Sequence, residues 1–134
     1  MKSEKCVLVL DENLPLGLAA NTAAILGVTL GKRLPEIVGA DVRDGGGKEH
    51  LGIVAFPIPV LKSTPERIRA LRERIPEEVT AVDFTELAQG CRTYGEFTGK
   101  MAGTPPEELR YLGLGICGPR KAVDRLTGSL PLLR

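Results

Sequence analysis

KCVLVLDENLPLGLAANTAAILGVTLG, at residues 5–31, carries the strongest structural signal in the chain. Cys6–Leu10 is a short, wholly apolar run of β-forming residues, which is typical of a strand in the middle of a buried sheet. Asp11–Asn13 interrupts the run, and a long apolar helix is predicted over Leu16–Lys32. The stretch therefore predicts a strand, a polar loop and a helix. In open α/β sheets, ligands bind beside loops at the carboxyl ends of strands.

The other elements follow from turn residues and hydrophobic periodicity. They are a hairpin turn at Asp44–Gly47, a strand over Ile53–Leu61, a helix that opens at Ser63–Glu66, a strand over Val79–Phe84, interrupted helical segments over Leu87–Met101, a strand over Tyr111–Cys117 and a helix over Pro119–Thr127. This order predicts a single α/β domain over residues 1–134, with helices on both faces of a sheet of about four strands. The apolar tail, residues 130–134, is expected to fold back onto the body or onto a partner.

The helix after residue 63 has two possible N-caps. Thr64 can cap it with Pro65 at the first helical position, or Ser63 and Glu66 can form a capping box. Its buried stripe is predicted to be Ile68, Leu71 and Ile75. We interpret the interleaved charged residues as a solvated face in preference to a binding patch; they are Arg67, Arg69, Arg72, Glu73 and Arg74.

The composition describes a soluble globular protein. Hydrophobic residues make up 43% of the chain and charged residues 26%, and the net charge is +1. No global field therefore draws the chain to nucleic acid or to an anionic membrane, and any RNA contact needs a local patch. Residues 13–31 carry no charge, but Asn13, Pro15 and Asn21 favour a core helix over a membrane span. Such a helix is expected to be covered on most sides, and a second subunit is one candidate for the cover. The short apolar run before Asp11 does not predict a signal peptide, so we expect a cytoplasmic protein.

The cysteines give no metal or disulfide pattern. Cys6, Cys91 and Cys117 are far apart and form no CxxC pair, and two of them lie in strand-like runs. Free cysteine in such runs behaves as a small hydrophobic residue. We therefore predict no disulfide framework, no metal site and no cofactor.

Glycine-rich and polar segments offer weak candidates for chemistry. Gly113–Gly118 matches GxGxxG by letter, but two of its glycines lie inside a strand, where they let a helix approach closely. Gly118-Pro119-Arg120 starts a helix and could hold an anion. An ion pair between Arg120 and Asp124 is the favoured alternative for this arginine. His50, the only histidine, is predicted to be a surface residue.

Asp11, Glu12 and Asn13 stand at the end of the first strand. Asp and Asn side chains commonly form turns and cap helices in such positions. Turn formation and helix capping are therefore the simple alternative to a role of these residues in ligand binding.

Two stretches together resemble a known family. CVLVLDENLPLGLAAN (residues 6–21) and YLGLGICGPRKAVDRLTGSLPLLR (residues 111–134) resemble the two ends of peptidyl-tRNA hydrolases of the archaeal and eukaryotic type. The whole chain is similar to short bacterial proteins of this fold that form a domain of unknown function. The resemblance implies a three-layer α/β/α sandwich with a mixed four-stranded sheet, often a homodimer, and tRNA as a conceivable partner.

The catalytic residues of those hydrolases do not carry over. The family has Gly-Lys-x-Ala-Ala-Gln at the helix start, whereas Gly17-Leu18-Ala19-Ala20-Asn21 is shorter and lacks the lysine. The family aspartate before the last strand is missing too, since no Asp occurs between Asp83 and Asp124, and Glu96 is the acid considered in its place. Because a cation and an acid are both lost, hydrolysis of peptidyl-tRNA by that mechanism is not expected, and the catalytic residues are unknown.

A pocket without this chemistry remains the working hypothesis. It requires the first and last strands to be adjacent and central, with their outgoing turns in a single cleft. The residues expected to bind a small polar or anionic ligand there are Asn13, Gly17, Asn21, Tyr94, Cys117, Gly118 and Arg120.

We expect a non-catalytic, dimeric binding or regulatory protein. The alternative is a hydrolase acting on peptidyl-tRNA or a related acylated substrate with a rearranged site. It needs Glu96 or Asp11 within hydrogen-bond reach of Asn21. A third possibility is a structural dimer whose tail seals the interface.

Overall fold

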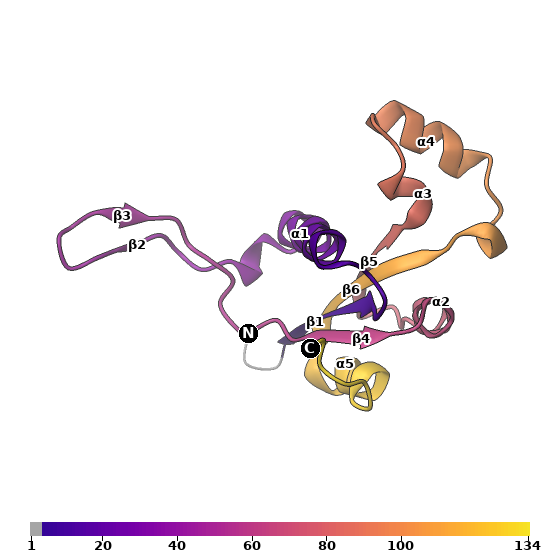
Figure 1. Cartoon of the computed structure of the whole chain (residues 1–134). Coiled ribbons are helices and arrows are strands. Elements are labelled where there is room, and N and C mark those ends of the chain that lie inside the picture. The colour runs from indigo at the N-terminus through magenta and orange to yellow at the C-terminus, as the bar shows by residue number, and fades with distance from the viewer. Residues whose placement is uncertain (1–3) are drawn as a thin grey trace.

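A four-stranded mixed sheet forms the centre of the computed structural model, which describes residues 4–134 (Figure 1). Its strands, in spatial order, are β4 (Val60–Ser63), β1 (Glu4–Asp11), β6 (Tyr111–Pro119) and β5 (Thr80–Thr85). β1 runs parallel to β4 and antiparallel to β6, and β6 runs antiparallel to β5. The first and last strands are therefore central neighbours, as predicted.

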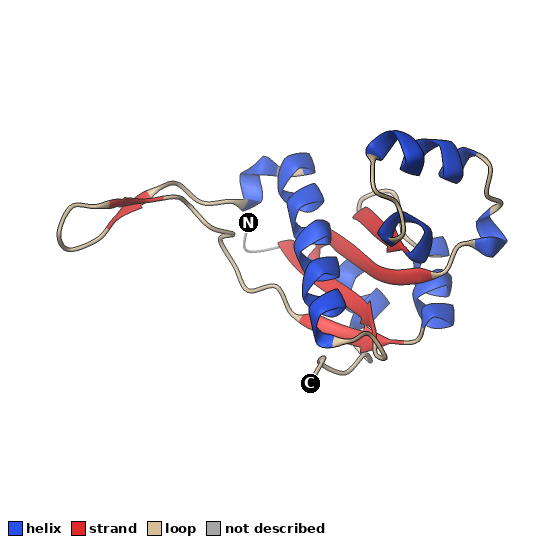
Figure 2. Ribbon diagram, turned by 45° about the horizontal axis from the view of Figure 1, so that its top comes forward, coloured by secondary structure: helices blue, strands red, loops and turns tan. Residues whose placement is uncertain are grey.

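Within residues 4–134, five α-helices accompany the sheet. α1 (Leu16–Arg33) lies on one face, and α2 (Pro65–Glu73) and α5 (Arg120–Thr127) lie on the other (Figures 1 and 2). α3 (Glu86–Gln89) and α4 (Tyr94–Ala102) follow β5 and correspond to the predicted interrupted segment, which breaks near Gly90. Short 3-10 helices, η1 (Pro35–Ile37) and η2 (Pro106–Glu108), join the elements. The predicted mixed α/β architecture is confirmed.

β1 is apolar on both faces because each face is covered. Cys6, Leu8 and Leu10 point into the core beneath α1. Val7 and Val9 point into a second core beneath α2 and α5. Period-two alternation of side chains distributes one uninterrupted apolar run between these two cores.

Two glycines of β6 let α1 lie close to the sheet. A Cβ atom on Gly113 would lie 2.7 Å from Cγ2 of Thr22, and one on Gly115 would lie 3.1 Å from Cδ1 of Leu30. The predicted role of these in-strand glycines, close approach of a helix, is thus confirmed.

α1 begins where predicted and ends one residue later, at Arg33. Lys32 and Arg33 occupy its last turn, where cations interact favourably with the negative end of the helix dipole. Among residues 4–134, no helix has the length and apolar character needed to cross a membrane.

α2 uses the first of its two predicted N-caps. Thr64 accepts a hydrogen bond from the N–H of Arg67, and Pro65 is the first helical residue. Ile68 and Leu71 of the predicted stripe are buried, and Ile75 lies half-buried beyond the end of the helix.

A long hairpin extends away from the sheet (Figures 1 and 2). We call residues 38–54 the arm; it holds β2 (Val42–Arg43), β3 (Glu49–His50) and the predicted turn at Asp44–Gly47. The strand predicted over Ile53–Leu61 is wrong for most of its length, because the first regular pairing starts at Val60. Pro57 and Pro59 have no N–H to donate, which explains the late start.

The C-terminal tail folds back onto the body of the same chain. The N–H of Leu133 donates to the carbonyl of Val60 at 2.9 Å, and the N–H of Lys62 donates to the carbonyl of Pro131 at 3.0 Å. The tail thereby covers the outer edge of β4, which would otherwise expose unpaired backbone groups.

The prediction of no disulfide is wrong for one pair. Cys6 and Cys117 form a disulfide between β1 and β6, and Cys91 is free. The two cysteines face each other in the register of the central strands, with Cα atoms 4.1 Å apart. A sequence separation of 111 residues conceals this proximity.

Candidate anion-binding pocket

The single cleft predicted between the outgoing turns of β1 and β6 does not form. The two strands are antiparallel, with Lys5 opposite Gly118 and Leu10 opposite Gly113. The Asp11–Asn13 loop and the Gly118–Arg120 turn therefore lie at opposite ends of the sheet, about 20 Å apart at the usual rise per strand residue. This prediction is wrong because the sequence pattern identified both central strands but not their relative direction.

The residues predicted for the first wall surround the start of α1. Asn13, Gly17 and Asn21 are all exposed. The N–H of Asn13 donates to Oδ1 of Asp11 at 3.0 Å, so this loop makes the local turn expected as the simple alternative. Asp11 is buried, and Nη2 of Arg110 lies 3.9 Å from its second oxygen.

The residues of the second wall lie in acidic or open surroundings. Cys117 and Gly118 border a hollow of about 250 Å³ that carboxylates also line, from Glu4, Glu36 and Glu78. Such a hollow does not suit an anion.

Arg120 and Tyr94 are separated from those residues. Arg120 is exposed at the start of α5, and Asp124 pairs with Lys5 at 2.6 Å, so the predicted Arg120–Asp124 ion pair is not formed. Tyr94 is exposed on α4 and borders a separate cavity of about 420 Å³ together with Phe97. The structure thus distributes the seven predicted ligand-binding residues over several places.

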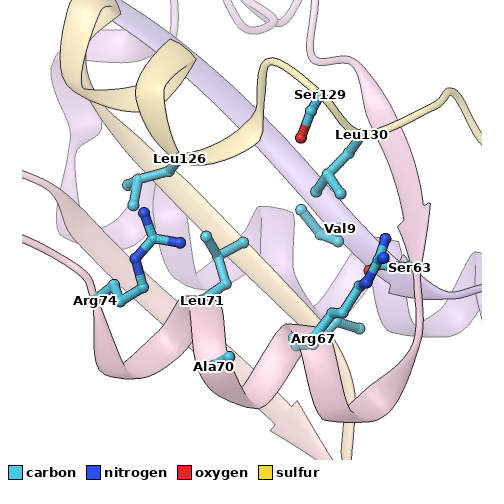
Figure 3. A pocket seen from close by; sticks show the side chains of 10 residues that line it. Val9, Ser63, Arg67, Ala70, Leu71, Arg74, Leu126, Ser129 and Leu130 are labelled. Carbon is cyan, nitrogen blue, oxygen red and sulfur yellow. The ribbon is translucent and has the colours of Figure 1, made fainter.

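A different pocket lies on the opposite face of the sheet from α1, between α2 and the end of α5 (Figure 3). Its volume is about 310 Å³. Three buried apolar residues, Val9, Ile68 and Leu71, belong to its lining, and the C-terminal segment adds Leu126, Ser129 and Leu130. Ser63, Arg67 and Arg74 supply further polar groups.

Ser63 is the most unusual residue of this pocket. It ends β4 in register with Asp11, and its carbonyl accepts a hydrogen bond from the N–H of Glu12 at 2.9 Å. Its side chain is different: the residue is 5% exposed, and among residues 4–134 Oγ has no hydrogen-bond partner. A buried hydroxyl without a partner is costly, and a bound group or a water molecule can supply the missing hydrogen bond.

The arginines of the α2 segment fall into two pairs. Arg69 donates to the carbonyl oxygens of Pro106, Glu107 and Leu109 and lies over the ring of Tyr111, and Arg72 donates to Asp83 at 3.2 Å.

Arg67 and Arg74 differ from that pair. Both line the pocket, and among residues 4–134 neither guanidinium has an ion-pair or hydrogen-bond partner. Sequence analysis missed them because it treated all the arginines of this helix as one solvated face. Their spacing of seven residues, which returns to one side of a helix after two turns, was the available signal.

The chemistry of this pocket suits anion binding. Two guanidinium groups and two hydroxyls surround apolar side chains, and no acidic residue lines the pocket. Guanidinium groups bind carboxylate and phosphate by paired hydrogen bonds. Within the described part of the chain, no cluster of three His, Cys, Asp or Glu side chains is arranged to hold a metal ion.

The fold and the pocket together define a small α/β protein with a mixed sheet and an arginine-flanked pocket beside its last helix. The chain belongs to DUF2000, a family described as proteins of unknown function, whose model matches residues 4–134.

A solved structure of a protein of unknown function from Agrobacterium tumefaciens strain C58 has the same fold. Its TM-score is 0.89 and its sequence identity 23%, and the match covers 98% of each chain. At this identity the likeness shows the fold alone. No curated protein matches the sequence.

Proposed function

We propose that this protein is a non-catalytic binding or regulatory protein for a small anion, which it holds in the pocket between α2 and α5. The observation that carries the proposal is the buried, unpartnered hydroxyl of Ser63. Arg67 and Arg74 line the same pocket and have no carboxylate partner among the described residues, which supports a negatively charged ligand. This site replaces the cleft expected from the sequence, while the class of ligand stays the same.

We also propose that residues 1–134 form one domain with a three-layer α/β/α arrangement, on a scaffold like that of the peptidyl-tRNA hydrolases. The positions of α1 on one face and of α2 and α5 on the other support the layers. The two terminal sequence stretches support the scaffold. A cytoplasmic location remains part of this proposal.

The hydrolase alternative needs an acid beside Asn21. Among residues 4–134, Asp11 accepts a hydrogen bond from Asn13 and lies near Arg110, and Glu96 is held by Lys100 and the N–H of Arg92. Neither carboxylate is hydrogen-bonded to Asn21. Turnover of peptidyl-tRNA that Asn21→Ala abolishes would overturn the binding proposal in favour of the hydrolase.

A homodimer is the third part of the proposal. Leu51 and Ile53 on the arm are 81% and 79% exposed, and Leu16, at the start of α1, and Val28, farther along it, are 87% and 74% exposed. A two-stranded hairpin alone is only marginally stable in water, so cover for the arm adds stability. A second copy can supply it, since each protomer of a two-fold dimer offers the same arm and the same helix face.

Thermal unfolding with inorganic phosphate tests the anion site. We expect phosphate to raise the melting temperature of the wild-type protein, because a ligand at a hundredfold excess over Kd stabilises the folded state by about 2.7 kcal/mol. Arg67→Gln should remove most of this rise, whereas the matched variant Arg120→Gln, on an exposed arginine outside the pocket, should keep it.

Ser63→Ala gives a second, sharper result. It should weaken phosphate binding without lowering the stability of the free protein, because the variant no longer buries an unpaired hydroxyl. Equal shifts in wild type, Arg67→Gln and Ser63→Ala, or a shift that only Arg120→Gln removes, would contradict the assignment of the pocket.

A further inference from the structure

We infer that the ligand of the α2–α5 pocket is a linear dianion, in which an apolar chain joins two anionic groups, and that it lies lengthwise along α2. This inference rests on the proposed function and specifies the class of ligand. It depends on the separation of the two guanidinium groups and on what lies between them.

Arg67 and Arg74 lie at opposite ends of the pocket (Figure 3). Arg67 is in the first turn of α2, and Arg74 is its C-cap. Seven residues of helix correspond to a rise of about 10 Å, and the two guanidinium groups do not converge on one point of the pocket (Figure 3). Two separate anionic groups match two separate cations.

Most of the side chains that line the pocket between the arginines are apolar, and Ser129 adds a hydroxyl group (Figure 3). Ile68 and Leu71 extend along α2 between them, and Val9 and Leu130 also line the pocket. No acidic or amide side chain is part of the lining. An apolar chain can cover these side chains and remove them from water, whereas a polar linker would lose its hydration there without a partner.

The two ends of the pocket are not equivalent. Ser63 contributes its buried, unpartnered Oγ at the β4 end of the pocket, just before the first turn of α2 where Arg67 lies. Both arginines are exposed, but the side chain that lies near Arg74 in the lining is the apolar Leu126, which offers no second polar group (Figure 3). The first anionic group should therefore be held by Arg67 and Ser63, and the second, more weakly, by Arg74 alone.

The test compares aliphatic dicarboxylates with monocarboxylates of equal length: succinate with butyrate, adipate with hexanoate, suberate with octanoate and sebacate with decanoate. Calorimetric titration should show one chain length at which the dicarboxylate binds about fivefold to twentyfold more tightly than its partner, as one additional charge-assisted hydrogen bond allows.

Variants separate the two ends. Arg74→Gln should reduce the affinity of the best dicarboxylate to that of the monocarboxylate and leave monocarboxylate binding unchanged. Arg67→Gln should weaken both ligands. The control Arg125→Gln, on an exposed arginine of α5 that does not line the pocket, should change neither.

The possible failures are distinguishable. If monocarboxylates and dicarboxylates bind equally at every length, or if Arg74→Gln affects both alike, the dianion inference is wrong while the anion site stands. If no carboxylate and no phosphate binds in an Arg67-dependent manner, the proposed function fails as well.

Discussion

At Gly113, the lack of a Cβ atom lets α1 lie close to the sheet. The glycine lies on β6 beneath Thr22 and Leu26 of α1 and opposite Leu10 of β1, and a Cβ atom there would approach all three. Thr22 and Leu26 are fully buried, so they have little room to move. The absence of a side chain at this position is therefore a packing requirement and does not reflect a nucleotide-binding loop.

Gly113→Ala should destabilise the protein by about 1–3 kcal/mol, the usual cost of overpacking a dense core. Gly27→Ala on α1 is the matched control, because nothing lies within 4 Å of its added Cβ atom. It should be neutral or stabilise the helix by up to about 1 kcal/mol. Urea unfolding of both variants measures the difference, and equal stabilities would refute this account of α1 packing.

At the scale of an element, the arm depends on a network centred on Asp44. Its Oδ1 accepts hydrogen bonds from the N–H groups of Gly46 and Lys48 at 2.9 and 3.0 Å, and its Oδ2 lies 2.9 Å from Nε2 of His50. Gly47 completes the turn with a φ of 87°, which favours glycine. His50 is thus the surface residue that the sequence predicted, and it links the two strands of the hairpin.

The hydrogen bond from His50, followed by those from the backbone of Lys48 and Gly46, lowers the pKa of Asp44 below its usual 3.8. Because the pKa is lowered in the folded arm, the stabilisation is complete above pH 3.8 and is lost as the pH falls through the lower, folded-state pKa. Carboxyl carbon NMR should show this low pKa.

Two variants of the arm check the cause of the shift. His50→Ala should move the pKa of Asp44 part of the way back toward 3.8, because the backbone donors remain. Arg43→Ala, which removes contacts to Gly47 and Glu49 instead, should move it little. An Asp44 that titrates at its ordinary value in the wild-type protein would count against the network.

At the scale of the whole molecule, the arm is the part that the sheet does not support. At its base, Val54 packs against the core beneath α1, and the two flanking segments are joined by a hydrogen bond from the N–H of Ala55 to the carbonyl of Ile37 at 2.8 Å. The arm and α1 both expose large apolar side chains, Leu51 and Ile53 on the arm and Leu16 and Val28 on α1. In the proposed dimer, the apolar side chains of one protomer would cover those of the other.

Sedimentation equilibrium should therefore find a dimer in the wild-type protein. The double variant Leu51→Asp with Ile53→Asp should shift it toward a monomer at micromolar concentration, because buried unpaired charges oppose association. Lys121→Asp, on exposed α5 across the sheet from α1, introduces a similar charge and should leave the dimer intact. A monomeric wild type would refute the dimer while leaving the anion site untouched.

Local sequence signals predicted most of the elements. The apolar run at Cys6–Leu10, the uncharged helix after Pro15 and the Thr64-Pro65 cap depend on short-range preferences, which are legible in a single sequence. The strand after residue 53 was misplaced because prolines interrupt pairing without removing β-type composition.

The candidate site was much less predictable than the elements. The seven residues first assigned to it were chosen on the assumption that β1 and β6 have outgoing turns on the same side of the sheet. The seven-residue spacing of Arg67 and Arg74 places them on one side of the helix, but it does not show that they lack the partners that Arg69 and Arg72 have, because those partners come from other elements.

The sequence by itself determined most of the strands and helices, the close approach of a helix to the β6 glycines and the need for the apolar tail to be covered, by the body or by a partner. Hydrophobic periodicity and turn chemistry are local, so they act within a few residues. Tertiary structure alone decided that β1 and β6 are antiparallel, that Cys6 faces Cys117 and that Ser63 is buried beside two unpaired arginines. Those facts depend on strand direction and on contacts between distant segments, which no local pattern specifies.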